Sequence, residues 1–131
     1  MPIPPLERIL LVDDEADIRQ VARLALEALG GFDVRECSSG LAAPDAAAGF
    51  VPDLILMDVM MPGQDGPATL KILRATPGLA QIPIVFMTAK VQPQEVSAFR
   101  SLGALDVIAK PFDPMTLAQT VRRIWELQNQ A

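Results

Sequence analysis

The chain has 131 residues, of which 50% are hydrophobic and 21% charged, with a formal net charge of -5 and a pI near 4.6. This length predicts one domain with one continuous core, and the acidic balance excludes the concentrated basic surface that nucleic-acid binding requires. Neither a signal peptide nor an apolar run of roughly 20 residues is present, so we expect a cytoplasmic protein without a nucleic-acid or membrane partner.

The cysteine and histidine content excludes several kinds of metal and catalytic site. The chain has one cysteine, Cys37, and no histidine. A single cysteine forms no internal disulfide, and Cys/His metal sites and Ser/His or Cys/His catalytic pairs need a histidine. Cys37 is therefore expected to be a small hydrophobic residue of the core at the end of a strand.

Short apolar segments alternate with segments of helical periodicity along the chain, which indicates repeated β-α units and a parallel sheet. We predict strands where these segments are brief and almost wholly apolar, as in strands covered on both faces. They are Arg8 to Val12, Asp33 to Cys37, Leu54 to Met57, Ile84 to Met87 and Asp106 to Ala109. The domain is expected to span residues 8–128, with tails at 1–7 and 129–131.

Helices are predicted after each strand. The first ends at Gly30-Gly31 and has apolar residues at three- and four-residue spacing, namely Ile18, Val21, Ala22, Ala25 and Leu29. The second must hold Pro44 in its first turn, and its alanine-rich sequence offers little to bury. The third runs from about Pro67 to Ala75, and the fourth from Pro93 to about Leu102.

The last helix is predicted to begin with Asp113 as N-cap and Pro114 at its first position. Trp125 is expected to lie beside its apolar stripe and to be half-buried. The stripe itself consists of Leu117, Val121, Ile124 and Leu127.

Polar residues follow four of the predicted strands: Asp13-Asp14, Asp58, Thr88 and Lys110-Pro111. In an open α/β sheet the site lies outside the carboxyl ends of the strands. If these strands are neighbours, three carboxylates, a hydroxyl and an ammonium meet in one shallow cleft.

Three close carboxylates repel one another unless a cation is present. Mg²⁺ suits this set because it prefers oxygen ligands and needs few carboxylates besides waters and phosphate oxygens, and Mn²⁺ is also compatible. A carboxylate can attack phosphorus to form an aspartyl-phosphate, and Asp58 is the best placed. Lys110 and Thr88 would then surround the equatorial oxygens.

Sequence blocks at the strand ends, taken together, closely resemble the receiver domain of two-component response regulators. They are Val12-Asp13-Asp14-Glu15, Leu56-Met57-Asp58-Val59-Met60-Met61-Pro62-Gly63, Met87-Thr88-Ala89 and Ala109-Lys110-Pro111-Phe112. The resemblance covers about residues 8–128. It implies a flavodoxin-like, doubly wound five-stranded parallel sheet in the order 2-1-3-4-5, flanked by five helices.

The resemblance also implies a metal site and a phosphoacceptor. Asp58 would accept the phosphoryl group. Asp14 would bind Mg²⁺ directly and Asp13 through water, with Met60 contributing its backbone carbonyl.

Further residues of these blocks would act in the switch that follows phosphorylation. Thr88 would hydrogen-bond the phosphoryl group, Ala89 would leave room for it, and Lys110 would bind it. The peptide bond between Lys110 and Pro111 would be cis. Met60 and Lys90, which flank the site, would help to set the lifetime of the phosphoryl group.

One position departs from the family pattern, which places Tyr or Phe three residues before Lys110. Val107 stands there, and valine cannot rotate inward as an aromatic ring does. We therefore expect the switch to act through the fourth helix and its preceding loop, residues 89–93.

The expected function is a regulatory switch, which catalyses only its own Mg²⁺-dependent phosphorylation and dephosphorylation. A histidine kinase, a histidine phosphotransfer protein or a small phosphodonor would supply the phosphoryl group. The output would be altered binding to a downstream protein, or to a second copy through the fourth and fifth helices. Only about three residues follow the last helix, so we expect no output domain in this chain.

Alternatives remain at this point. A phosphohydrolase of the haloacid dehalogenase type uses similar groups, but it needs an acid where Met60 stands. An FMN carrier would meet repulsion from Asp13-Asp14-Glu15, and an adaptor that never carries phosphate would not need Asp58. Asp13 or Asp17 could cap the first helix, Thr88 could bond only to backbone, and Lys110 could be an ordinary surface residue.

Overall fold

Five parallel strands form the central sheet, in the order β2-β1-β3-β4-β5. They are β1 (Arg8–Val12), β2 (Asp33–Cys37), β3 (Leu54–Asp58), β4 (Ile84–Thr88) and β5 (Asp106–Ala109). This computed structural model describes residues 3–129. The predicted fold class and strand order are confirmed, with β3 and β4 each one residue longer than expected. The outermost parts of the predicted tails, residues 1–2 and 130–131, lie outside the described residues.

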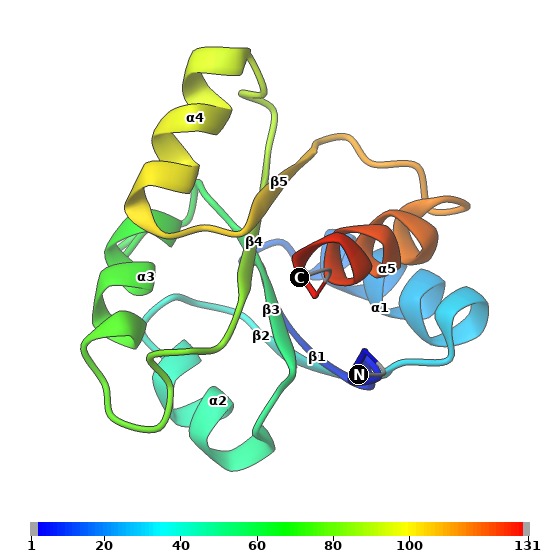
Figure 1. Cartoon of the computed structure of the whole chain (residues 1–131), viewed down its shortest axis with the longest axis horizontal. Helices are drawn as coiled ribbons and strands as arrows, with labels where there is room; N and C mark the ends of the chain where they lie inside the picture. Colours follow the sequence, from blue (N-terminus) through cyan, green and yellow to red (C-terminus); the bar gives the residue numbers. More distant parts are fainter. Residues whose placement is uncertain (1–2, 130–131) are drawn as a thin grey trace.

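Helices cover both faces of the sheet (Figure 1). α1 (Ala16–Gly30) and α5 (Leu117–Gln128) lie on one face, and α2 (Ala43–Phe50), α3 (Gly66–Arg74) and α4 (Pro93–Leu102) lie on the other. Successive side chains of a strand point to opposite faces, so each strand must be apolar at nearly every position. In β1, Ile9 and Leu11 pack toward α1 and α5, whereas Leu10 and Val12 pack toward α2 and α3.

The apolar stripe of α1 differs from the prediction. Ala22, Ala25 and Leu26 are its buried residues, whereas Val21 and Leu29 are 45% and 51% exposed. Because α1 packs on the sheet and also beside α5, its buried stripe turns toward Leu26 and away from Val21. The spacing had placed Val21 and Leu29 with the apolar residues of the helix, but spacing alone does not show which of them the core covers.

The residues around the start of α5 also require a correction. Asp113 is not the N-cap, because α5 begins at Leu117 after a turn over residues 114–116. The Asp113 carboxylate accepts a hydrogen bond from the Met115 amide at 2.9 Å, two residues on. The Asp113 carbonyl also accepts a hydrogen bond from the Leu117 amide at 3.0 Å, so Asp113 caps a turn that leads directly into α5.

At the other end of α5, Leu127 is 58% exposed, contrary to the prediction, and Trp125 is buried at 8% exposure. The indole Nε1 of Trp125 donates a hydrogen bond to the Pro4 carbonyl at 2.8 Å. The large indole ring therefore occupies the space against the N-terminal segment, and Leu127 is left in solvent.

Other local predictions are confirmed. Cys37 is buried, and its Sγ lies 3.2 Å from the Ser39 carbonyl oxygen. Pro44 lies in the first turn of α2.

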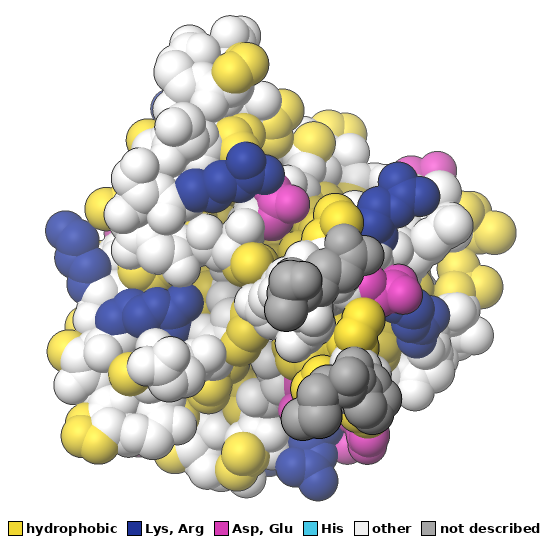
Figure 2. All heavy atoms as spheres, in the orientation of Figure 1, with side chains coloured by type: hydrophobic (Ala, Val, Ile, Leu, Met, Phe, Trp, Pro, Cys, Tyr) yellow, Lys and Arg dark blue, Asp and Glu magenta, His cyan; other side chains and the backbone are white. Residues whose placement is uncertain are grey.

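Within residues 3–129, no helix combines the length and apolar composition needed to cross a bilayer. Figure 2 shows basic and acidic side chains spread over one face of the molecule, with hydrophobic side chains between them.

The α4 helix is attached mainly near its carboxyl end, and none of its side chains is fully buried. Half-buried Phe99 packs edge-on against Phe86 of β4, with ring centroids 5.3 Å apart. Arg100 pairs with Asp106 at 2.8 Å, and Arg74 of α3 donates to the Gly103 carbonyl at 3.1 Å. These contacts leave the amino-terminal half of α4 dependent on the loop that follows β4.

A strained residue ends α2 and provides a test of the backbone. Val51 has φ 54° and ψ 64° and is 62% exposed. A β-branched residue is unfavourable in this left-handed conformation, which asparagine tolerates. We expect Val51→Asn to raise the free energy of unfolding by about 1 kcal/mol, measured by urea unfolding. Val51→Ala, which keeps the Cβ atom, is the control, and an unfolding midpoint that falls in Val51→Asn would contradict the strain.

Candidate functional site

Three carboxylates meet at the carboxyl ends of β1 and β3. Asp13 and Asp58 are buried, at 0% and 4% exposure, and Asp14 is exposed. One carboxylate oxygen from each residue lies within 4.8 Å of the others. The order of the strands explains this, because β1 and β3 are direct neighbours and both run toward the same edge of the sheet. The structure thus brings together the acidic residues predicted from the sequence.

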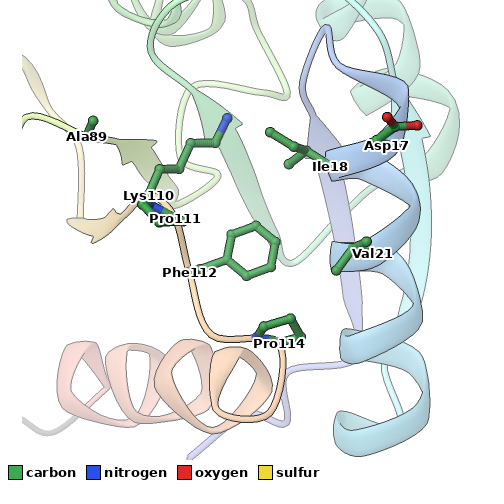
Figure 3. Close-up of a pocket in the computed structure, with 8 residues that line it drawn as sticks. All are labelled: Asp17, Ile18, Val21, Ala89, Lys110, Pro111, Phe112 and Pro114. Atoms are coloured by element: carbon green, nitrogen blue, oxygen red, sulfur yellow. The ribbon is translucent and has the colours of Figure 1, made fainter.

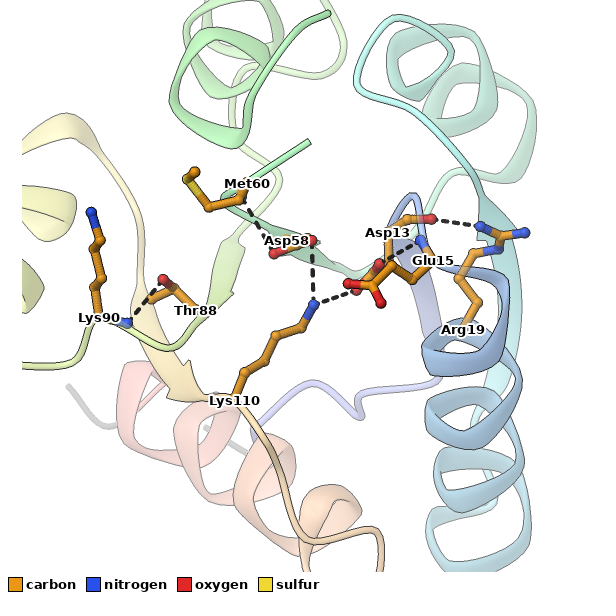
Figure 4. A network of polar contacts seen from close by, with 8 residues as sticks. All are labelled: Asp13, Glu15, Arg19, Asp58, Met60, Thr88, Lys90 and Lys110. Carbon is orange, nitrogen blue, oxygen red and sulfur yellow. Dashed lines mark hydrogen bonds and ion pairs between the residues drawn. The ribbon is translucent and has the colours of Figure 1, made fainter. Parts of the chain in front are cut away.

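Lys110, which follows β5, reaches across the sheet to these acids (Figure 4). Its Nζ atom lies 2.8 Å from Asp13 Oδ2 and 3.3 Å from Asp58 Oδ2. Its side chain is only 14% exposed, so it is not an ordinary surface lysine. The Lys110-Pro111 peptide bond is cis, as expected.

The electrostatics of the cluster follow from burial and from the neighbouring charges. Burial raises the pKa of Asp58 above its usual value, and the charge of Asp13 raises it further, while Lys110 opposes both. Burial alone would lower the pKa of Lys110, but its hydrogen bond and charge interaction with Asp13, and then those with Asp58, raise it. Lys110 therefore stays charged, and it supplies positive charge to a cluster that contains more acids than bases.

The turn after Asp58 is held close to the strand. The Met60 amide lies 3.4 Å from Asp58 Oδ1, and the Gly66 amide donates to the Val59 carbonyl at 2.9 Å. A Cβ atom at Gly66 would lie 2.8 Å from the Asp58 carbonyl oxygen, so only glycine allows α3 to begin this close. The Met60 side chain is 69% exposed, and the role of its carbonyl as a metal ligand stays a prediction.

Thr88 ends β4 and is buried at 3% exposure. Its Oγ1 accepts a hydrogen bond from the Lys90 amide at 3.1 Å (Figure 4). In this state the hydroxyl therefore binds the backbone, which was the alternative left open by the sequence. Ala89 between them is exposed. Val107 of β5 is half-buried and, like Phe99, packs against the core cluster that includes Phe86.

Two residues near the cluster were missed by the sequence analysis. Arg19 of α1 donates through Nη1 to the Asp13 carbonyl at 2.7 Å and pairs through Nε with Glu36 of β2 at 3.1 Å. Glu36 precedes Cys37 at the carboxyl end of β2, so its position at that edge was a usable signal. Nothing in the sequence pattern indicated that Arg19 bends back to the β1–α1 turn.

An apolar groove lies next to Lys110, between α1 and the segment that follows β5 (Figure 3). Its volume is about 460 Å³, and Ile18 and Val21 of α1 face Phe112 and Pro114 across it. Val21 lines this groove, which explains why its side chain is exposed. The carboxylate cluster is thus bordered by an apolar surface to which Lys110 also contributes.

The donor set fits a hard divalent cation. The oxygens of Asp13, Asp14 and Asp58 are within reach of one ion, and carboxylate oxygens are the ligands that Mg²⁺ and Mn²⁺ prefer. Burial and, after it, the charge of Asp13 raise the pKa of Asp58, and a bound cation would offset both effects. Asp14, as the exposed member, would be the ligand nearest to solvent.

Comparisons with known proteins agree with this geometry. The family model described as "Response regulator receiver domain" matches residues 9–122. The DNA-binding response regulator MtrA of Mycobacterium leprae is 39% identical over 116 residues, which are 88% of this chain and 50% of that protein. The regulatory protein AtoC of Escherichia coli is 36% identical over 95% of this chain and 26% of its own length. The chain therefore spans half or less of these relatives.

Solved structures give the same result. The chemotaxis response regulator CheY4 of Vibrio cholerae superposes with a TM-score of 0.83 at 30% identity, over 92% of this chain and 99% of that chain. The signal receiver domain of a histidine kinase from Syntrophus aciditrophicus superposes with a TM-score of 0.78, also at 30% identity. That match covers 95% of this chain and 94% of the other.

The raised pKa of Asp58 predicts a gain in stability on neutralisation. A carboxyl whose folded pKa exceeds its unfolded value loses stability as pH rises through the folded pKa, so at neutral pH the charge destabilises the fold. We expect Asp58→Asn to be more stable than wild type in EDTA. With Mg²⁺ at 100 times its Kd, wild type should gain about 2.7 kcal/mol and the variant less, measured by urea unfolding. An equal gain in both proteins would contradict a metal site at Asp58.

Proposed function

The chain belongs to the response regulator receiver domain family, and from this membership we propose that Asp58 accepts a phosphoryl group and thereby switches partner binding. The observation that carries the proposal is the meeting of Asp13, Asp14 and Asp58 within 4.8 Å, with Lys110 3.3 Å from Asp58. A nucleophilic carboxylate, acids for a divalent cation and a fixed ammonium are the groups that phosphoryl transfer to aspartate requires.

In the proposed reaction, a carboxylate oxygen of Asp58 attacks phosphorus and forms an O–P bond. The bond from phosphorus to the donor breaks, and its electron pair leaves with the donor, a histidine nitrogen or the oxygen of a small phosphodonor. Bound Mg²⁺ would neutralise charge on the transferring oxygens. Lys110 holds its ammonium beside Asp58 before the reaction, so this positive charge needs no large movement to meet the phosphoryl group.

The protein would act as a switch and would not turn over other substrates. Its catalysis would be limited to its own Mg²⁺-dependent phosphorylation and dephosphorylation. The phosphohydrolase alternative is disfavoured by Met60, because a thioether cannot transfer a proton to a leaving group. Mn²⁺ would replace Mg²⁺ at the same oxygen ligands.

Thr88 would transmit the switch. To hydrogen-bond the phosphoryl group, its hydroxyl must turn from the Lys90 amide, which leaves that amide without its partner. This change acts on the loop of residues 89–93 and on the less firmly attached amino-terminal half of α4. Val107 cannot contribute a rotating ring, so the loop and α4 would carry the signal.

Receiver domains receive the phosphoryl group from histidine kinases or histidine phosphotransfer proteins, and we propose such a donor for this chain, in the cytoplasm. The apolar groove beside Lys110 supports docking there, because a protein donor must bring its histidine to the edge where Asp58 lies. The downstream partner would be another protein, or a second copy that contacts α4 and α5. Pro111 lines this groove, and so does Ala89, the first residue of the loop 89–93.

Phosphorylation can be tested directly. Incubation with Mg²⁺ and acetyl phosphate is expected to add one phosphoryl group, seen as a single increment in intact mass. EDTA and Asp58→Asn should each abolish the increment, and Lys110→Ala should slow its formation about 100-fold. The matched control is Asp45→Asn on α2, an exposed acid outside the cluster. If Asp58→Asn is labelled as fast as wild type, Asp58 is not the acceptor.

The proposed route of the switch can be tested by hydrogen exchange. Beryllofluoride with Mg²⁺ should speed exchange of the Lys90 amide about tenfold. The amide would lose its hydrogen bond to Thr88 Oγ1, and a bond of this kind contributes a net free energy of about 1.4 kcal/mol. In Thr88→Ala the bond is already absent, so beryllofluoride should leave Lys90 exchange unchanged. A response confined to β5 around Val107, with residues 89–93 unaffected, would show that the signal follows another route.

A further inference from the structure

Every polar group of Asp13 is engaged. Its amide donates to the Cys37 carbonyl at 3.0 Å, and its carbonyl accepts from Arg19 Nη1 at 2.7 Å. Its carboxylate accepts from the Glu15 amide at 2.9 Å and from Lys110 at 2.8 Å. Among these contacts, the hydrogen bond from Arg19 is the one that fixes the direction of the Asp13 carbonyl.

That carbonyl belongs to the peptide unit that leads into Asp14. The peptide is planar, so fixing its oxygen also fixes the position of the Asp14 amide and Cα atom. Asp14 is exposed, and its carboxylate therefore depends on the backbone of the β1–α1 turn for its place. Arg19 acts on the geometry of Asp14 without touching its side chain.

Glu36 gives Arg19 its orientation and balances its charge. Arg19 uses Nε for Glu36 at 3.1 Å and Nη1 for the Asp13 carbonyl, two donors on one planar group. The Arg19 side chain is only 17% exposed, so the pair is partly shielded from solvent. A guanidinium this close to a cation site would repel the cation if the Glu36 carboxylate did not compensate its charge.

Resting on the proposed function, we propose that Arg19 is a positioning residue for the divalent cation, which holds the Asp13-Asp14 peptide in the orientation that directs Asp14 to the metal. Outer contacts of this kind typically change metal affinity 10- to 100-fold when they are removed. Arginine is required because a lysine ammonium cannot bond the carbonyl and Glu36 in the same fixed plane.

Arg23, one turn further along α1, provides a matched control. Its Nη1 lies 3.1 Å from the same Glu36 carboxylate, and its Nε lies 3.3 Å from Glu27, but it makes no bond to Asp13. Arg19→Ala and Arg23→Ala each remove an arginine that pairs with Glu36. Only the first removes the bond to the Asp13 carbonyl.

The test is Mn²⁺ affinity of the purified chain, from the paramagnetic resonance signal of free Mn²⁺, with stability measured in parallel by urea unfolding. Arg19→Ala should raise the Kd about tenfold or more, and Arg23→Ala should keep it within twofold of wild type. Arg19→Lys, which preserves charge and most of the packing, should also raise the Kd. It serves as the second variant if Arg19→Ala does not fold.

Equal Kd values for Arg19→Ala and Arg23→Ala would overturn the inference, and so would wild-type affinity in Arg19→Lys. Both outcomes leave Mn²⁺ binding by wild type intact, and hence leave the proposed function standing. A wild-type chain that binds no divalent cation would instead remove the proposed function, and this inference would fall with it.

Discussion

The repulsion between the buried carboxylates of Asp13 and Asp58 is the constraint around which this edge of the molecule is built. Two acids at 0% and 4% exposure cannot both be ionised at low cost without positive charge nearby. Lys110 supplies one charge from a third strand end, and the cluster still has acid in excess. This imbalance makes the edge suited to a divalent cation. In the function proposed above, the cation and Lys110 would also offset the charge of a phosphoryl group.

The sheet order converts that electrostatic need into geometry. β1 and β3 are adjacent, and β4 and β5 follow on one side. Asp13 therefore lies close to Asp58 and Lys110, which stand 45 and 97 positions later in the chain. The polar groups stand at or after the carboxyl ends of the strands, whereas β1, β3 and β4 are apolar on both faces along nearly all of their length. The buried inner strands β3 and β4, together with β1, therefore hold these side chains in place from the core of the sheet.

Much of this arrangement could be predicted from the sequence because the inner strands β1, β3 and β4 are almost wholly apolar and polar residues stand at or directly after their carboxyl ends. The strand bounds to within one residue, the sheet order taken from the family resemblance, and the meeting of Asp13, Asp14 and Asp58 were all predicted. Val21 and Leu29 belong to the apolar spacing noted for α1 but are exposed, because periodicity alone does not show which apolar residues of a helix face the sheet and the neighbouring helix. Arg19 was missed since a side chain that bends back to a backbone carbonyl leaves no periodic signal.

The position of the indole of Trp125 determines what the intrinsic fluorescence of this protein can report. The ring is held against Pro4, which precedes β1, and it therefore lies at the amino edge of the sheet, across the molecule from Asp58. Because Trp125 is the sole tryptophan, the emission of the protein should change little when metal or phosphate binds at the opposite edge. Its emission is instead a clean optical measure of global unfolding and of the docking of the N-terminal segment.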